Sequence, residues 1–136
     1  MIKRAGHLNR HAGEISFPGG MFEREDVDLL TTALRETHEE LHLEVPIDAV
    51  VGRLSTVLTA TGIMVTPFVA VLPAPPRYQA NGEVELVLEI SISDLFATEQ
   101  QDTTSIGENF IFRSGEHRIW GASAKILHEM ARSEVF

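Results

Sequence analysis

Three glutamates in this chain are spaced so that they could act together. Glu36, Glu39 and Glu40 stand at positions i, i+3 and i+4, which share one face of an α-helix. Carboxylates on one face repel each other, and a hard divalent cation, which prefers oxygen ligands, would remove that repulsion. A solvated acidic surface is the alternative for such a cluster taken alone. The neighbouring sequence has to decide between the two interpretations.

A helix predicted over residues 28–42 would carry these glutamates. Asp26 or Asp28 can cap its start. Just upstream, residues 14–17 alternate polar and apolar side chains as a short strand does, and the turn Pro18-Gly19-Gly20 ends that strand. The opposite side of the helix carries apolar residues at helical spacing that can pack on a core: Leu30, Ala33, Leu34 and Leu41.

The rest of the chain predicts an α/β or α+β fold. Residues 1–5 are expected to be the end of a strand and 97–109 a polar loop. Trp120 is expected to be a core residue, with stacking on a nucleotide base as the alternative. Pro67 predicts an edge or a bulge. Strands interleaved with separated helices indicate a mixed sheet between helices, in one domain over 1–136 without repeats or linkers. The strands are predicted at 50–59, 64–72, 84–92, 110–113 and 117–120, with a helical turn at 93–96 and a closing helix at 121–132.

Composition excludes several classes of protein. The net charge of −9 opposes a nucleic-acid footprint, which needs clustered Lys and Arg. No apolar run is long enough to span a membrane, and the basic N-terminus has no apolar segment of the secretory type. Cysteine is absent, which fits a reducing cytoplasm and excludes disulfide and thiolate chemistry. A small anionic substrate stays compatible with the charge, because a bound metal can invert the local field.

The glutamate segment resembles the Nudix box. Gly20 is followed by Asp26, then by Arg35-Glu36 and Glu39-Glu40, as in the arrangement Gly, acidic residue, Arg-Glu-x-x-Glu-Glu. The spacer to Arg35 is one residue longer than in the general motif, and Asp26 replaces the usual Glu. Thr37 and His42 replace an aliphatic residue and the terminal Gly.

The longer spacer is similar to that of Nudix hydrolases of the coenzyme A pyrophosphatase type. Their upstream signature is matched in register by Arg4-Ala5, Gly13 and Phe17-Pro18-Gly19-Gly20. Asn9 stands where an Arg is usual, with Arg10 beside it. The resemblance continues to the last helix through the segments 61–67, 83–89 and 118–121.

The resemblance implies a metal-dependent hydrolase of a diphosphate bond in a nucleotide, with Mg²⁺ or Mn²⁺ as cofactor. The implied metal ligands are Glu36, Glu39, Glu40 and the Gly20 carbonyl, while Gly19 and Gly20 admit the substrate phosphates. Arg35 is expected to hold a box carboxylate. The base is either a box glutamate, Glu39 or Glu40, or Glu83 from a distant loop. The implied substrate is coenzyme A or its acyl or oxidised forms, cleaved to 3′,5′-ADP and 4′-phosphopantetheine, with Arg4, Arg10 or Lys3 meeting the 3′-phosphate.

Three alternatives stay open. The substrate could be ADP-ribose or another nucleoside diphosphate derivative, or the domain could bind nucleotides without catalysis. His38-Glu39-Glu40-Leu41-His42 also matches H-E-x-x-H, the helix of zinc peptidases, although that motif leaves Arg35 and the Gly-Gly turn unexplained. Finally, the family signature follows a hydrophobic strand, so we expect either an incomplete N-terminus or a second copy that completes the sheet edge in a homodimer.

Overall fold

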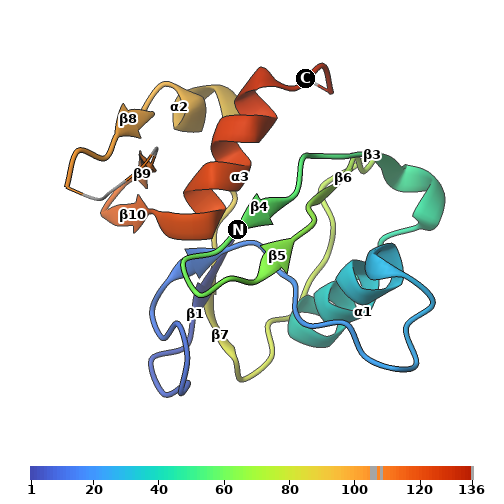
Figure 1. Cartoon of the computed structure of the whole chain (residues 1–136). Coiled ribbons are helices and arrows are strands. Elements are labelled where there is room, and N and C mark those ends of the chain that lie inside the picture. Colours follow the sequence, from blue (N-terminus) through green and yellow to red (C-terminus); the bar gives the residue numbers. More distant parts are fainter. Residues whose placement is uncertain (105–106, 108, 136) are drawn as a thin grey trace. The chain divides into compact units, whose positions relative to one another are not determined.

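The segment with the three glutamates is helical in the computed structural model, which describes residues 1–104, 107 and 109–135 (Figure 1). Helix α1 spans Leu29–Leu41, within one residue of the prediction at each end. Asp28 is its N-cap, and the Asp28 side chain accepts a hydrogen bond from the Thr31 amide at 2.8 Å. Of the two predicted caps, Asp28 is therefore the correct one.

Two groups of elements form separate compact units. The first comprises Met1–Arg53 and Phe68–Leu88 and holds α1. Its strand β1 (Ile2–Arg4) pairs antiparallel with both β2 (Ile15–Ser16) and β7 (Val84–Val87). The 3-10 helix η1 (Ile47–Ala49) leads into β3 (Val50–Arg53), which pairs with β6 (Phe68–Ala70). Burial of Ile2, Leu41 and Val84 joins α1 to the β1–β7 pair.

The second unit comprises Leu54–Pro67 and Glu89–Phe136. It contains the pair β4 (Val57–Leu58) and β5 (Met64–Val65), and the short helix α2 (Ile92–Phe96). The sheet β10-β9-β8 is built from His117–Ile119, Phe110–Ser114 and Gln100–Gln101. Helix α3 (Gly121–Arg132) packs beside β9, as Figure 1 shows. Phe112, Ile119 and Leu127 are fully buried.

The α+β class is confirmed, with antiparallel strand pairs in small sheets throughout the described residues. Each of the long predicted strands 50–59 and 64–72 is split into two short ones. Pro67 lies at the split, since it has no amide proton, and its carbonyl accepts a hydrogen bond from Leu54 at 3.0 Å. The predicted loop 97–109 contains β8, and its residues 105, 106 and 108 lie outside the described part.

The expectation for Trp120 was wrong. Side chains alternate along β10 and its continuation, so that Ile119 points into the core while Arg118 and Trp120 face outward. The Trp120 side chain is 46% exposed. The hairpin β9–β10 and helix α3, in contrast, begin and end close to where the sequence predicts them.

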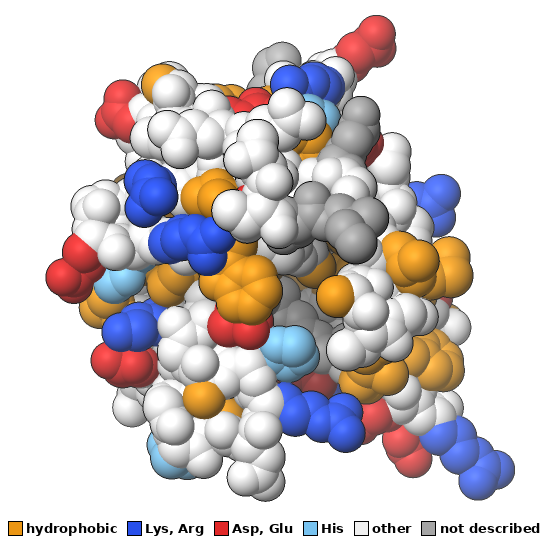
Figure 2. Space-filling model, turned by 60° about the vertical axis from the view of Figure 1, so that its left-hand side comes forward, with side chains coloured by type: hydrophobic (Ala, Val, Ile, Leu, Met, Phe, Trp, Pro, Cys, Tyr) orange, Lys and Arg blue, Asp and Glu red, His pale blue; other side chains and the backbone are white. Residues whose placement is uncertain are grey.

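On the face shown in Figure 2, Lys and Arg side chains of the described residues lie among Asp and Glu side chains. The absence of a nucleic-acid partner stays a prediction. Each helix in the described ranges falls short of the length and apolar character that a membrane crossing requires. The organisation as one domain over 1–136 stays a prediction.

Candidate active site

The guanidinium of Arg35 is the centre of the polar network on α1. It donates from Nε to Asp26 Oδ1 at 2.9 Å and from Nη2 to Asp26 Oδ2 at 3.0 Å. Its Nη1 donates to Glu36 Oε1 and to Glu39 Oε1, both at 3.1 Å. A further bond from Nη2 reaches the Met21 carbonyl at 3.1 Å. The predicted pairing of Arg35 with box carboxylates is therefore present, and its strongest partner is Asp26.

Asp26 is a buried anchor for this network. Besides the two bonds from Arg35, its Oδ2 accepts from the Thr32 hydroxyl at 2.8 Å and from the Glu23 amide at 2.9 Å. The hydrogen bond from Arg35 and then that from Glu23 hold the pKa of Asp26 well below its usual range. The same Asp26 contact raises the pKa of Arg35. Both groups stay charged at any physiological pH.

Glu36 lies directly against the Gly-Gly turn. A Cβ added to Gly20 would clash with Oε1 and Cδ of Glu36 where that side chain now lies. Burial and then the charge of Glu39 raise the pKa of Glu36, against the opposing bond from Arg35. Gly20 therefore provides the space in which the Glu36 carboxylate is held.

Glu40 is the most enclosed of the three glutamates, at 2% exposure. Its Oε2 accepts a hydrogen bond from the Gly19 amide at 3.2 Å. Burial raises the pKa of Glu40 to about 7, although the Gly19 bond and the charge of Arg4 act against this; the charges of Glu36 and Glu83 add to the increase. A carboxyl group with this pKa exchanges protons near neutral pH.

Glu39 and Glu83 are more accessible. The Glu39 side chain is 52% exposed and is held by Arg35. Glu83 follows the Asn81-Gly82 turn, is exposed, and acts electrostatically on Glu40. The structure therefore brings Glu83 near the box glutamates, although Glu83 lies 43 residues after Glu40 in the sequence.

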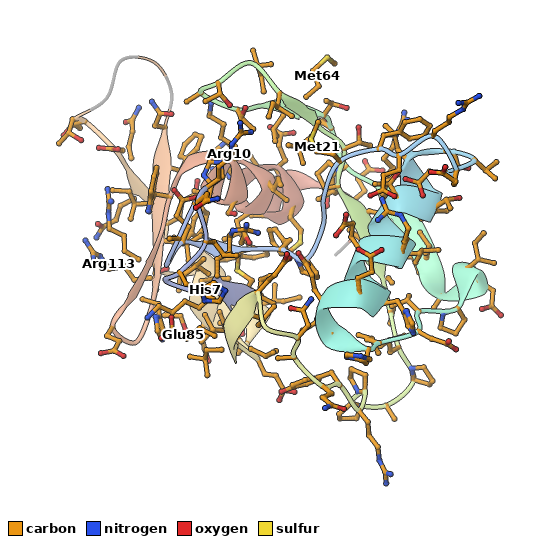
Figure 3. All side chains as sticks on the ribbon, turned by 90° about the horizontal axis from the view of Figure 1, so that it is seen from below. His7, Arg10, Met21, Met64, Glu85 and Arg113 are labelled. Atoms are coloured by element: carbon orange, nitrogen blue, oxygen red, sulfur yellow. The ribbon has the colours of Figure 1, made fainter. Side chains whose placement is uncertain are left out.

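Of the two predicted phosphate-binding arginines, only Arg4 is tied electrostatically to the box. Its charge acts on Glu40, and its Nε is buried without a hydrogen-bond partner among the described residues. Its Nη2 reaches the backbone carbonyl of Arg10 at 3.5 Å. The Arg10 side chain itself is exposed in the loop that follows β1, where Figure 3 also labels His7.

The donor set fits a hard divalent cation by type. Glu40 offers a buried carboxylate and Glu36 a partly buried one beside the Gly19-Gly20 turn, and the charge of Glu36 raises the pKa of Glu40. In the described part of the chain, no three His, Asp or Glu side chains converge closely enough to hold a metal ion. In this structure Arg35 Nη1 donates to both Glu36 and Glu39, and thus occupies one oxygen of each carboxylate. The assignment of the metal ligands stays a prediction.

The two histidines of the H-E-x-x-H pattern have separate partners. His38 Nε2 lies 3.8 Å from Glu44 Oε1, whereas His42 Nδ1 bonds the Gln79 carbonyl at 2.9 Å. His42 is also the C-cap, in the left-handed conformation with φ 50°. The two rings lie 6.2 Å apart between centroids, but His42 Nδ1 is engaged by the Gln79 carbonyl, so this nitrogen is not free to bind zinc.

Sequence reasoning missed Thr32 and Asn81. Thr32 is buried on Asp26, and only its position six residues after Asp26 could have suggested the contact. By residue type, Asn81 with Gly82 indicates no more than a turn. It bonds the end of α1 from 42 residues away, as described below.

Comparison with known proteins agrees with this geometry. Residues 1–105 match the model of the NUDIX domain. A protein of Enterobacter sp. (strain 638) named "Uncharacterized Nudix hydrolase NudL" is 32% identical over 142 residues, covering 96% of this chain and 72% of that protein. Proteins of the same name from Photorhabdus laumondii and Yersinia pestis are 30% and 32% identical and cover 97% of this chain, which spans 74% and 70% of them.

The chain belongs to the Nudix family. It is a hydrolase that acts on diphosphate bonds, and the Nudix-type α+β fold is confirmed. Hydrolases of this family generally use divalent metal ions. Arg35, Glu36, Glu39 and Glu40 on α1 lie within the matched residues 1–105, and Asp26 is the buried acidic partner of Arg35. Their assignment as the functional residues of the Nudix box stays a prediction.

Proposed function

We propose that this hydrolase cleaves the diphosphate bond of coenzyme A, or of its acyl or oxidised forms, to give 3′,5′-ADP and 4′-phosphopantetheine. The observation that carries the proposal is the position of Arg4. This residue belongs to the coenzyme A type signature in the sequence, and its charge acts on Glu40, with a buried Nε that lacks a partner among the described residues. A phosphate oxygen would satisfy that donor.

Mg²⁺ or Mn²⁺ is the cofactor that the donor set suits. Glu36, Glu40 and the Gly20 carbonyl are the groups that would hold it, with Glu39 as a further carboxylate. When bound, the cation would neutralise the diphosphate and acidify a water molecule. Arg35 keeps Glu36 and Glu39 on the same side of α1.

Two carboxylates are candidates for the group that accepts the proton from water. Glu40, with its pKa near 7, is ready to exchange a proton at neutral pH. Glu83 is exposed, and so it can meet a bound substrate without displacing other side chains. Arg10 is a second candidate for binding the substrate phosphate, because its backbone carbonyl accepts a hydrogen bond from Arg4 at 3.5 Å and so lies beside that residue.

The runner-up is hydrolysis of ADP-ribose or another nucleoside diphosphate. Asn9 favours this second candidate, because an Arg of the coenzyme A type signature is absent there. A nucleotide-binding module without catalysis is the third candidate. We further propose a cytoplasmic location, since a chain without cysteine suits a reducing compartment, and a homodimer, which light scattering in solution would test.

Product analysis decides between these candidates. The protein is incubated with coenzyme A, ADP-ribose or NADH and either Mg²⁺ or Mn²⁺, and the products are identified by mass spectrometry. We expect 3′,5′-ADP from coenzyme A at the highest kcat/KM, with strong loss in Glu40→Gln. Glu44→Gln is the matched control, because the Glu44 side chain is 88% exposed and forms an ion pair with His38 at 3.8 Å on the helix surface. Faster cleavage of ADP-ribose would overturn the substrate proposal, and tight binding without cleavage would favour the third candidate.

A further inference from the structure

The end of α1 is closed by a loop from a distant part of the chain. The last carbonyls of a helix have no partners within it and need donors from elsewhere. Here the Gln79 amide bonds the Leu41 carbonyl at 2.7 Å, and the Asn81 amide bonds the Glu40 carbonyl at 2.8 Å. The Asn81 side chain adds a third bond, from Nδ2 to the Glu39 carbonyl at 3.1 Å. Residues 79–81 therefore hold the backbone of two box glutamates.

The same side chain holds Glu83. Asn81 Oδ1 accepts a hydrogen bond from the Glu83 amide at 2.9 Å. The Glu83 carbonyl in turn accepts from the Ala5 amide at 2.9 Å, next to Arg4. One amide group thus donates to the box helix and accepts from the residue that follows the turn. Only Asn has a donor and an acceptor on a side chain of this length.

We propose that Asn81 is a positioning residue for hydrolysis, whose amide fixes Glu83 relative to Glu39 and Glu40. The inference rests on the proposed role of Glu83 in the reaction. A turn alone does not require a hydrogen bond from the Asn81 side chain to helix α1. The turn itself is closed by the Oδ1 bond and by a bond from the Val84 amide to the Asn81 carbonyl at 3.3 Å, whereas the bond from Nδ2 to Glu39 joins positions 42 residues apart. That long-range bond is what couples the turn to the box.

Two substitutions separate the turn from the link. Asn81→Asp keeps an acceptor for the Glu83 amide but loses the donor to Glu39, while Asn81→Ala loses both. Gln79→Ala is the matched control in the same loop, because it truncates a side-chain amide and leaves the backbone bond to Leu41 in place. We expect kcat to fall by roughly 10- to 100-fold in both Asn81 variants, with KM changed less than about twofold and Gln79→Ala near wild type.

A double-mutant cycle with Glu83→Gln shows whether Asn81 acts through Glu83. If it does, adding Asn81→Ala to Glu83→Gln lowers kcat little further, because the positioned group is already disabled. The proposal would be overturned if the loss of kcat in the double variant equalled the product of the two single losses. An unchanged kcat in Asn81→Ala or in Glu83→Gln would also overturn it. Thermal unfolding of each variant identifies one that fails to fold, in which case Asn81→Asp carries the test. The cycle is run with the diphosphate that the wild type cleaves fastest. The test of Asn81 therefore still applies if the substrate is not coenzyme A.

Discussion

Asp26 and Arg35 form a two-point contact, in which one carboxylate accepts from both Nε and Nη2 of the same guanidinium at 2.9 and 3.0 Å. This geometry fixes the plane of the guanidinium and leaves Nη1 to Glu36 and Glu39. Asp26 therefore acts on the glutamates through Arg35, without touching them.

Replacing Asp26 by Asn should impair the site more than the fold. The amide cannot accept both bonds, so Arg35 loses its orientation. We expect roughly 10- to 100-fold lower turnover, as for other residues that orient metal-binding side chains. Steady-state kinetics with Mg²⁺ measures this. Asp28→Asn is the control, since Asn caps helices as well as Asp and the hydrogen bonds of the Asp28 side chain go to Thr31 at the helix start. Equal activities of the two variants would contradict the role of Asp26.

Gly20→Ala should displace the Glu36 carboxylate. The new Cβ would clash with Glu36 Oε1, but that oxygen ends a flexible side chain and can move at small cost to stability. We therefore expect weaker Mn²⁺ binding in titration calorimetry with little change in the unfolding temperature. Gly6→Ala is the control, because a Cβ at Gly6 meets nothing within 4 Å. Wild-type metal affinity in Gly20→Ala would remove Glu36 from the ligand set.

His42 occupies a backbone conformation that suits glycine. Its φ of 50° is in the left-handed region, which costs an ordinary L-residue about 1 kcal/mol. We predict that the free energy of unfolding is about 1 kcal/mol higher for His42→Gly than for His42→Ala. Both variants lose the bond to the Gln79 carbonyl, but only glycine relieves the strain. Urea unfolding of the two variants gives the difference. If they are equally stable, strain at this cap is negligible.

In the second unit, Glu99 should make stability depend on pH. Burial tends to raise the pKa of Glu99, but hydrogen bonds from His128 and Arg132 outweigh it and lower this pKa. A carboxylate with a depressed folded-state pKa contributes stability above its unfolded pKa of 4.5 and loses it as the pH falls through the folded value. The free energy of unfolding should therefore drop below about pH 4.5 less steeply in Glu99→Gln than in the wild type. Parallel curves for the two proteins would show that Glu99 does not contribute.

Local patterns predicted the elements well. Helix α1, the hairpin β9–β10 and helix α3 follow from short-range periodicity and turn residues, all of which are visible in the sequence. The splits within the predicted strands 50–59 and 64–72 were harder to predict. Pro67 marks one of them, but the partner break after Arg53 depends on the facing strand.

The residue types of the site were predictable, and their partners were not. Asp26 and Asp28 both fit the sequence pattern of a helix N-cap. The tertiary structure is needed to see that Asp28 accepts from the Thr31 amide, whereas Asp26 accepts from Arg35. The contact of Glu40 with Gly19 links residues 21 apart. No local pattern encodes it.

The closure of α1 by residues 79–81 also has a consequence for how the protein is made. His42 and Glu39 find their partners 37 and 42 residues later in the chain. While a ribosome is still synthesising that intervening segment, the last turn of the helix has no donors for its carbonyls and frays. The N-terminal half alone therefore cannot complete the box, and hydrolytic competence arises only after the residues that follow Pro76 have emerged and docked.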